Sequence, residues 1–194
     1  KYGLARVLIS ISLEIVNPVK GCIKLFAQTW HSQKKGPFFR RELVFKDENG
    51  NLIFHGSTFS VLLDLETRTI FRKKETPFYL GSPIQEFTIE ASPSFKTDIA
   101  FKEVGRRKVY NSYIDYLGHV NNTRYGEFAY DALTDEEKQN LHKMRRYEVF
   151  FLSELRCKDI FSVQKANIDN RIVIRGVNEI SGETSFDVLI EFDK

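Results

Sequence analysis

The sequence contains little cysteine and no long apolar run, and these shortages exclude two classes of protein. Only Cys22 and Cys157 occur among 194 residues, so we expect buried thiols and no disulfide framework. The apolar runs are short and interrupted, and no secretory signal opens the sequence, so we expect no membrane span. These features predict a cytoplasmic protein, or an organellar one if a transit peptide has been removed.

Several catalytic motifs are also missing. The sequence has no Gly-x-Ser-x-Gly elbow and no glycine-rich phosphate loop. His31, His55 and His142 have no Cys, His or carboxylate at metal-ligand spacing. The net charge of +3 is too small to indicate a nucleic-acid partner. We therefore expect a globular protein with no metal, no other cofactor and no nucleic acid.

What the sequence does contain is a group of polar residues at a strand-to-helix junction. β-forming residues lie between 106 and 113, and apolar residues recur at three- and four-residue spacing from 125 to 133, which predicts a strand and then a helix starting near Asn121. The first turn of such a helix has unpaired N–H groups and the positive end of the helix dipole, so it polarises a carbonyl oxygen placed there. Asp115 and His119 flank this position, a layout typical of a catalytic site.

The pattern Asp-x-x-Gly-His-Val-Asn-Asn-x-x-Tyr at residues 115–125 resembles the hotdog-fold thioesterases. The wider chain resembles the thioesterases that act on acyl groups carried by acyl carrier protein (ACP), which fuse two hotdog units in one polypeptide. Residues 3–8, 29–30 and 64–68 look like the first-domain signatures of that family, and Glu154 with Asp159 matches its Glu-containing strand segment. The resemblance therefore spans nearly the whole sequence.

This resemblance implies an α+β fold of two tandem hotdog units, each an antiparallel sheet wrapped on a central helix. We assign residues 1–71 to an N-terminal acyl-binding unit, 72–100 to an interdomain crossover and 101–194 to a C-terminal catalytic unit. The first half has no counterpart of the strand and helix at about 106–143. The first unit is therefore expected to be incomplete, with an exposed apolar face on its sheet.

Turn and cap signals divide both halves further. Residues 47–50 and 179–182 are typical of hairpin turns, and each is followed by a long final strand, 52–65 and 184–192. Thr134 and Glu137 have the spacing of a capping box, which predicts a second helix through about Lys143. The two halves are therefore expected to share one sheet arrangement, in which a hairpin turn leads into a long final strand.

The family resemblance implies catalytic roles for Asp115, His119 and Glu154. Taken alone, Asp115 is more readily a turn residue, and His119 a hydrogen-bonded histidine near a helix start. Taken together, they are interpreted as an acid–base set in which Asp115 or Glu154 activates water and His119 binds the thioester oxygen. Five further residues are assigned to substrate binding: Gly118, Val120, Asn121, Asn122 and Tyr125.

The junction departs from the family at one position. Leu117 stands where the plant enzymes have a catalytic asparagine, so backbone N–H groups near Gly118 and Val120 are expected to hold the oxyanion. Asn121 and Asn122 fit substrate binding or helix capping equally well, and a cap is favoured for one of them.

A strand is predicted around Glu154. Alternation along it places Leu152, Glu154 and Arg156 on one face and Cys157 on the other, which disfavours a cysteine nucleophile. A carboxylate facing the helix needs a partner, and His119 is the natural one.

By resemblance, the chain hydrolyses fatty acyl-ACP to free fatty acid and holo-ACP by water attack. The alternatives are a non-catalytic acyl-binding hotdog protein, which the Leu117 departure favours, and an acyl-CoA thioesterase. The expected partner is the acidic ACP with its acyl chain, and the protein itself is a monomer or a homodimer. Basic clusters bracket the junction and are either solvated surface or a docking face. The residues assigned to that face are Arg106, Arg107, Arg145 and Arg146.

Overall fold

The computed structural model describes residues 2–18, 21, 23–73, 75–79 and 81–193. The chain divides into two compact units, Lys1–Ser94 (unit 1) and Phe95–Lys194 (unit 2). The division falls inside the stretch 72–100 that was predicted as the crossover. Among the described residues, no helix is both long and apolar enough to cross a membrane.

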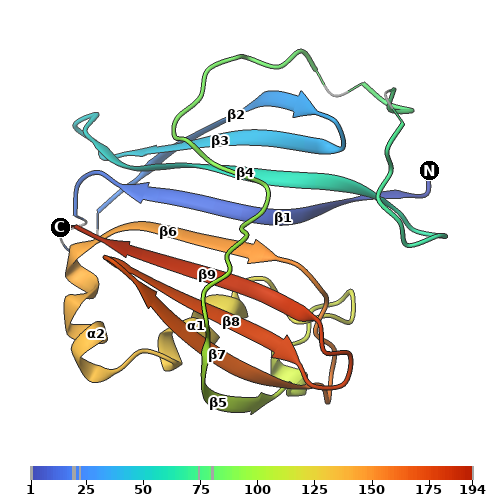
Figure 1. The fold of residues 1–194 in the computed structure, drawn as a ribbon. Coiled ribbons are helices and arrows are strands. Elements are labelled where there is room, and N and C mark those ends of the chain that lie inside the picture. The colour runs from blue at the N-terminus through green and yellow to red at the C-terminus, as the bar shows by residue number, and fades with distance from the viewer. Residues whose placement is uncertain (1, 19–20, 22, 74, 80, 194) are drawn as a thin grey trace. The chain divides into compact units, whose positions relative to one another are not determined.

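Unit 1 is an antiparallel sheet with the strand order β2-β3-β4-β1 (Figure 1). Its strands are β1 (Leu4–Ile15), β2 (Phe26–Lys35), β3 (Phe38–Lys46) and β4 (Leu52–Asp64). The predicted turn at 47–50 joins β3 to β4, where Asp47 Oδ1 accepts hydrogen bonds from the backbone of Asn49 and Asn51 and Gly50 has φ +82°. The described residues of unit 1 form no helix, which confirms the expected incomplete unit.

One face of the unit 1 sheet is apolar and only half-buried. The strand register places Leu13 and Leu43 on this face, and Ile15, Phe54 and Phe45 beside them. The rings of Phe45 and Phe54 stack with centroids 4.2 Å apart. All these side chains remain half-buried, as expected for a sheet that lacks the central helix of its own unit.

The other face of this sheet carries polar residues around Glu42 and is covered there by residues 84–92, which we call the strap (Figure 1). The backbone N–H of Ile84 donates to the carbonyl of His31 at 2.9 Å, and the indole of Trp30 donates to the carbonyl of Glu86 at 3.0 Å. At the other end, Ser10 Oγ donates to the carbonyl of Ser92 at 3.2 Å. The strap is therefore held along its length by hydrogen bonds to the sheet.

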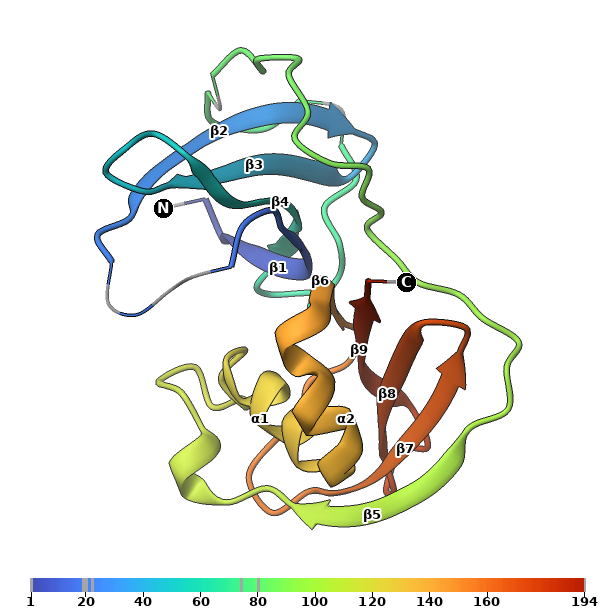
Figure 2. The same cartoon turned by 90° about the vertical axis from the view of Figure 1, so that its left-hand side faces the viewer.

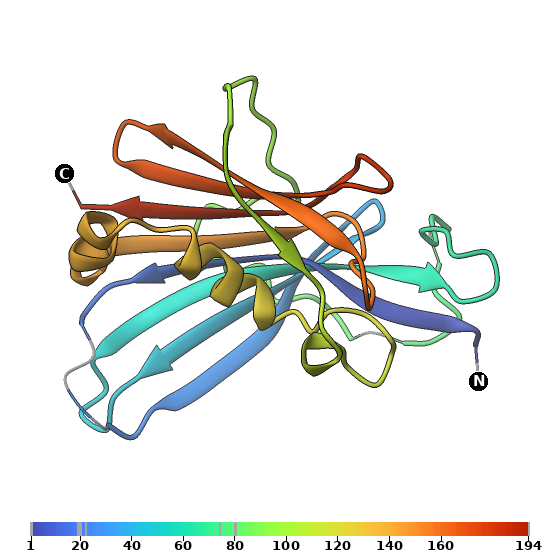
Figure 3. The ribbon, with the colours of Figure 1, turned by 90° about the horizontal axis from the view of Figure 1, so that it is seen from below.

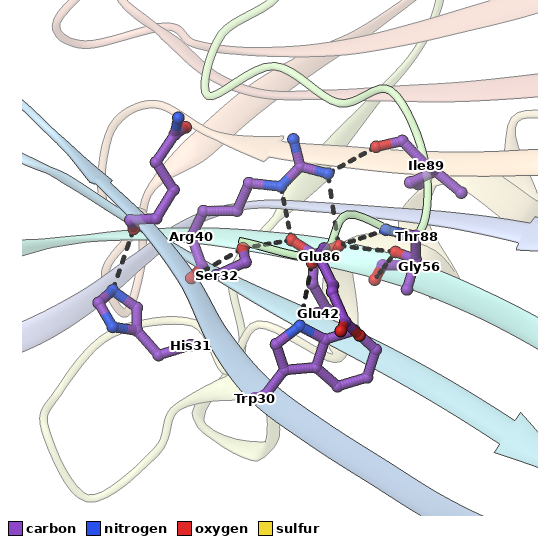
Figure 4. Close-up of polar contacts among 10 residues, drawn as sticks. Trp30, His31, Ser32, Arg40, Glu42, Gly56, Glu86, Thr88 and Ile89 are labelled. Atoms are coloured by element: carbon purple, nitrogen blue, oxygen red, sulfur yellow. Dashed lines mark hydrogen bonds and ion pairs between the residues drawn. The ribbon is translucent and has the colours of Figure 1, made fainter. Parts of the chain in front are cut away.

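A buried ion pair lies under the strap (Figure 4). Glu42 is 0% exposed, and its Oε1 accepts from Ser32 Oγ at 2.5 Å and Arg40 Nε at 2.7 Å. Its Oε2 accepts from the backbone N–H and the hydroxyl of Thr88 at 3.1 and 2.7 Å. Arg40 also donates to the carbonyl of Ile89. Burial alone would raise the pKa of Glu42, but the hydrogen bonds from Arg40, Ser32 and Thr88 hold it below its usual value.

Unit 2 combines an antiparallel sheet with two short α-helices. Its sheet order is β6-β9-β8-β7-β5, so β5 is the edge strand beside β7 (Figure 3). The strands are β5 (Lys102–Lys108), β6 (Met144–Phe151), β7 (Ile160–Ile168), β8 (Arg171–Asn178) and β9 (Thr184–Phe192). The helices are η1 (Asn111–Tyr113), α1 (Arg124–Asp131), α2 (Asp135–Gln139) and η2 (Asn140–Lys143). The helices α1 and α2 lie on the inner side of the curved sheet (Figure 2), the arrangement expected of a hotdog unit.

Aromatic rings fill the space between α1 and this sheet. Tyr125 and Phe128 of α1 contact Phe186 of β9 and Phe161 of β7, with centroid distances of 4.9 Å for Tyr125–Phe186 and 5.1 Å for Phe128–Phe161. All four residues are at most 4% exposed. Gly176 of β8 faces this cluster, and a Cβ there would lie 2.0 Å from the Phe186 ring. The core thus requires glycine at this position and is tightly packed.

The second helix differs in part from its prediction. The capping box is present, because Glu137 N–H donates to Thr134 Oγ1 at 3.2 Å and Thr134 N–H donates to Glu137 Oε2 at 2.7 Å. The single helix predicted through Lys143 is instead α2 followed by the 3₁₀ turn η2. Asn140 has a side-chain hydrogen bond to the carbonyl of Glu136, which competes with continued α-helix.

Candidate active site at the start of helix α1

A tight turn carries the candidate residues into α1. Ile114 and Val120 pair in an isolated antiparallel bridge, and Asp115 N–H donates to the carbonyl of His119 at 2.9 Å. Gly118 N–H donates to the carbonyl of Asp115 at 3.1 Å, and Gly118 has φ +84°, a conformation that glycine adopts without strain. The turn therefore fixes Asp115 opposite His119.

Asp115 has one oxygen bound within this turn. Its Oδ1 accepts from the backbone of Leu117 at 2.8 Å and, more weakly, from that of His119 at 3.4 Å. Within the described residues, no hydrogen bond or ion pair engages Oδ2. Asp115 is therefore a turn residue, as expected when it is considered alone. Its Oδ2 can still accept a hydrogen bond from a water molecule.

His119 and Glu154 lie together. The distance from His119 Nε2 to Glu154 Oε2 is 3.3 Å, and the two side chains are 23% and 39% exposed. This contact has the geometry of an ion pair when His119 is protonated. Among the described residues, the structure thus places Asp115, His119 and Glu154 in one site, although they come from two separate segments.

The strand predicted around Glu154 is wrong. β6 ends at Phe151, because the N–H groups of Leu152 and Ser153 both donate to the carbonyl of Ser185 and the ladder stops there. Alternation of exposure nevertheless continues: Leu155 is 0% exposed, whereas Leu152 is exposed. Glu154 therefore points toward solvent and His119. Its carboxylate loses less hydration free energy here than it would on a strand that faces the helix.

Asn121 forms a turn just before α1, whose N-cap residue is Thr123 and has no side-chain capping hydrogen bond. Asn121 Oδ1 accepts from the N–H of Thr123 at 3.0 Å and from its hydroxyl at 2.8 Å, and α1 begins at Arg124, three residues after the predicted start. Asn122 is exposed, and the described residues make no hydrogen bond to it. The helix cap favoured for one of the two asparagines is therefore not found at the start of α1, and the side chain of Asn122 is open to a ligand.

The backbone donors expected for the oxyanion are already in use. Val120 N–H donates to the carbonyl of Leu155 at 2.9 Å, and Gly118 N–H donates to Asp115. A donor bound to a protein carbonyl is not preorganised for a substrate oxygen. Val120, at 3% exposed, also cannot contact substrate directly. Within the site, His119 remains as the donor that faces outward.

Tyr125 is a core residue. It is 4% exposed and packs against Phe186 and Phe151. Burial, helped by the charges of Glu154 and Asp115, raises the pKa of Tyr125 to about 12, although a backbone hydrogen bond with Leu155 acts to lower it. Its hydroxyl therefore stays neutral near the two carboxylates. Tyr125 packs in the core beneath the site and does not contact substrate directly.

The four arginines assigned to carrier docking do not form one free basic surface. Arg106 pairs with Glu179 at 2.6 Å and Arg107 with Asp131 at 2.7 Å. Arg146 is half-buried and pairs with Glu148 at 3.0 Å. Among these four, Arg145 alone is exposed without such a contact in the described structure. The other three arginines are paired with carboxylates, Arg106 and Arg107 with residues distant in sequence and Arg146 with a residue of its own strand.

Cys157 shows no catalytic arrangement. Cys157 is a half-buried free thiol that donates to Asn111 Oδ1 at 2.7 Å, and Cys22 lies outside the described residues. In the part of the chain that the structure describes, no group of three or more His, Cys, Asp or Glu side chains is placed to hold a metal ion.

One prediction concerns Leu117, whose side chain is 60% exposed. Leu117→Asn should leave the melting temperature unchanged, because no core contact is lost. It should change kcat by less than about five-fold, since an exposed amide on a turn is not preorganised for an oxyanion. Thermal melting and steady-state thiol release measure both quantities. A gain of tenfold or more would instead indicate a site that lacks its proper donor.

Solved structures of other proteins are similar to this chain in fold. No protein-family model matches the chain, and no curated protein sequence matches it. An acyl-ACP thioesterase from Bacteroides thetaiotaomicron is similar in structure with a TM-score of 0.77 at 22% identity, covering 98% of this chain and 77% of that one. A 12:0-ACP thioesterase from Umbellularia californica matches with a TM-score of 0.74 at 12% identity, covering 99% and 76%.

The same architecture also occurs in a different enzyme class. A MaoC-like dehydratase from Phytophthora capsici has a TM-score of 0.63 at 13% identity, covering 97% of this chain and 72% of that one. The fold alone therefore does not fix the chemistry, which depends on the side chains of the site. By its architecture, the chain has the tandem hotdog fold of the acyl-ACP thioesterases, with a helix-free first unit among the described residues.

Proposed function

We propose that the chain hydrolyses fatty acyl-ACP to free fatty acid and holo-ACP. The observation that carries the proposal is the convergence of Asp115, His119 and Glu154 at the start of α1, within a fold shared with acyl-ACP thioesterases. Hydrolysis needs a base for water and a donor for the developing oxyanion, and these three side chains supply both.

In the proposed reaction, Asp115 Oδ2 takes a proton from water as the water oxygen attacks the thioester carbonyl carbon. His119 acts as the imidazolium: its Nε2–H faces the Glu154 carboxylate, and its Nδ1–H donates to the carbonyl oxygen as that oxygen gains negative charge. The C–S bond then breaks, and the proton on Asp115 passes to the departing sulfur. The products are a carboxylic acid and the thiol of holo-ACP.

The acyl chain needs an apolar surface outside the core of unit 2. Aromatic rings fill that core, with Phe161 and Phe186 both 0% exposed. The apolar face of unit 1, which carries Leu13, Leu43 and Phe54, is only half-buried. We therefore propose that unit 1 binds the acyl chain, and that a monomer or homodimer acts on ACP-linked substrate.

A panel of substrates tests the proposal. Purified protein is offered acyl-ACP and acyl-CoA of several chain lengths, and thiol release is followed. The expected result is turnover of acyl-ACP. Preference for acyl-CoA would select the acyl-CoA thioesterase alternative, and binding without turnover would select the non-catalytic acyl-binding protein.

Carrier recognition can be tested at Arg145, the member of the four arginines that is exposed and makes no ion pair in the described structure. Arg145→Glu should raise KM for acyl-ACP, and the effect should shrink with added salt, because exposed charges are screened over roughly 8 to 10 Å. Acyl-CoA hydrolysis should change less. An exposed cation of the other unit, Arg68, gives the matched variant Arg68→Glu, which should leave both substrates unaffected. Equal losses on acyl-ACP and acyl-CoA would contradict a docking role.

A further inference from the structure

Arg156 contacts the same carboxylate oxygen as His119. Its Nη2 donates to Glu154 Oε2 at 3.1 Å, and His119 Nε2 lies 3.3 Å from that oxygen. The Arg156 side chain is 63% exposed, so it is not held by burial. Glu154 therefore lies between a permanent cation and an imidazole whose charge depends on pH.

The backbone fixes both residues at this place. His119 and Arg156 face each other in an isolated antiparallel bridge. Arg156 N–H donates to Asp159 Oδ2 at 2.9 Å, and the same oxygen accepts from Asn178 at 3.0 Å. Asn178 is only 7% exposed, so this link ties Arg156 to the end of β8. The guanidinium thus starts from an ordered segment although its tip is exposed.

This placement bears on the orientation of Glu154. The charged and titratable groups around the imidazole are Asp115, Glu154, Arg156 and the hydroxyl of Tyr125. Arg156 and His119 contact the same carboxylate oxygen, so the hydrogen bond from Arg156 limits how far that oxygen can turn away from the imidazole.

We propose that Arg156 is a positioning residue for the proposed hydrolysis: it holds the Glu154 carboxylate against His119 Nε2. The inference rests on the proposed function, in which His119 acts on the thioester oxygen. Sequence reasoning placed Arg156 on the same face as Glu154 but gave it no role.

The test compares Arg156→Gln, Arg156→Lys and a matched control, Lys158→Gln, which removes an exposed cation two residues away. Arg156→Gln should lower kcat about three- to tenfold with KM for acyl-ACP unchanged, as expected for loss of one exposed ion pair that supports the reacting group. Arg156→Lys should restore at least half of the lost rate. Lys158→Gln should leave kcat, KM and melting temperature unchanged.

A second measurement does not depend on turnover. NMR signals of the His119 ring are compared at one pH in the resting protein. They should move in Arg156→Gln, because the carboxylate that faces Nε2 loses its second partner, and stay in place in Lys158→Gln. An increase in KM with unchanged kcat would overturn the proposal, because Arg156 would then bind an anionic part of the substrate. An unchanged rate and unchanged His119 signals would also overturn it. If wild type hydrolyses no thioester but the NMR shift occurs, the proposed function fails while the coupling of Arg156 to His119 stands.

Discussion

Glu42→Gln is expected to lower the free energy of unfolding by about 3 to 5 kcal/mol, the usual cost of removing one partner from a buried ion pair. Arg40 is 8% exposed and would keep its charge without the carboxylate that now accepts from it at 2.7 Å. Thr88 would lose a charged acceptor as well, so the strap should loosen. Urea unfolding followed by fluorescence of Trp30 measures the effect, because Trp30 is the single tryptophan and bonds to the strap.

The matched control is Glu48→Gln, an exposed carboxylate in the turn after β3 of the same unit. It should change the free energy of unfolding by less than about 0.5 kcal/mol. A similar loss in both variants would show that net charge, and not the buried pair, sets the stability. No loss in Glu42→Gln would contradict the role given to the network under the strap.

The same network predicts the response to acid. Hydrogen bonds hold the pKa of Glu42 below its usual value, so ionised Glu42 stabilises the fold above the carboxyl pKa of the unfolded chain, about 4.3. That contribution should be lost as pH falls below this value and through the pKa of the folded state. Glu42→Gln should lack this component of the pH dependence, which urea unfolding at several pH values will measure.

Asp115→Asn and His119→Ala are each expected to lower kcat by about 10² to 10⁴, the range for a positioned base or donor. Asparagine keeps the Oδ1 acceptor that Leu117 N–H uses, so the turn should remain folded while the base is lost. Steady-state thiol release from acyl-ACP measures the change. The controls Asp135→Asn and His142→Ala alter exposed residues elsewhere in unit 2 and should keep full activity. Full activity in the Asp115 and His119 variants would remove the site from the mechanism.

The strands and turns could be predicted from sequence because their signals are local. The last strand of unit 1 was predicted at 52–65 and is β4, Leu52–Asp64, after a turn set by Asp47 and Gly50. The end of β6 could not be predicted. It depends on Ser185, whose carbonyl accepts from both Leu152 and Ser153, and Ser185 lies far along the chain.

The candidate site, too, was predictable in its local features and not in its contacts between distant segments. Residue types and family resemblance were enough to group Asp115, His119 and Glu154. They could not show that the N–H of Val120 donates a hydrogen bond to the carbonyl of Leu155, because that bond joins two separate segments. The ion pairs of Arg106 and Arg107 could not be predicted for the same reason, since Glu179 and Asp131 are far from them in sequence.

The most direct test of the account is a single turnover of acyl-ACP by excess protein in H₂¹⁸O. Activation of water by Asp115 predicts thiol release and one ¹⁸O atom in the free fatty acid formed in the first turnover. Thiol release with an unlabelled first product would contradict it, because a protein carboxylate would then have attacked the thioester. Absence of thiol release would contradict the proposed hydrolysis itself.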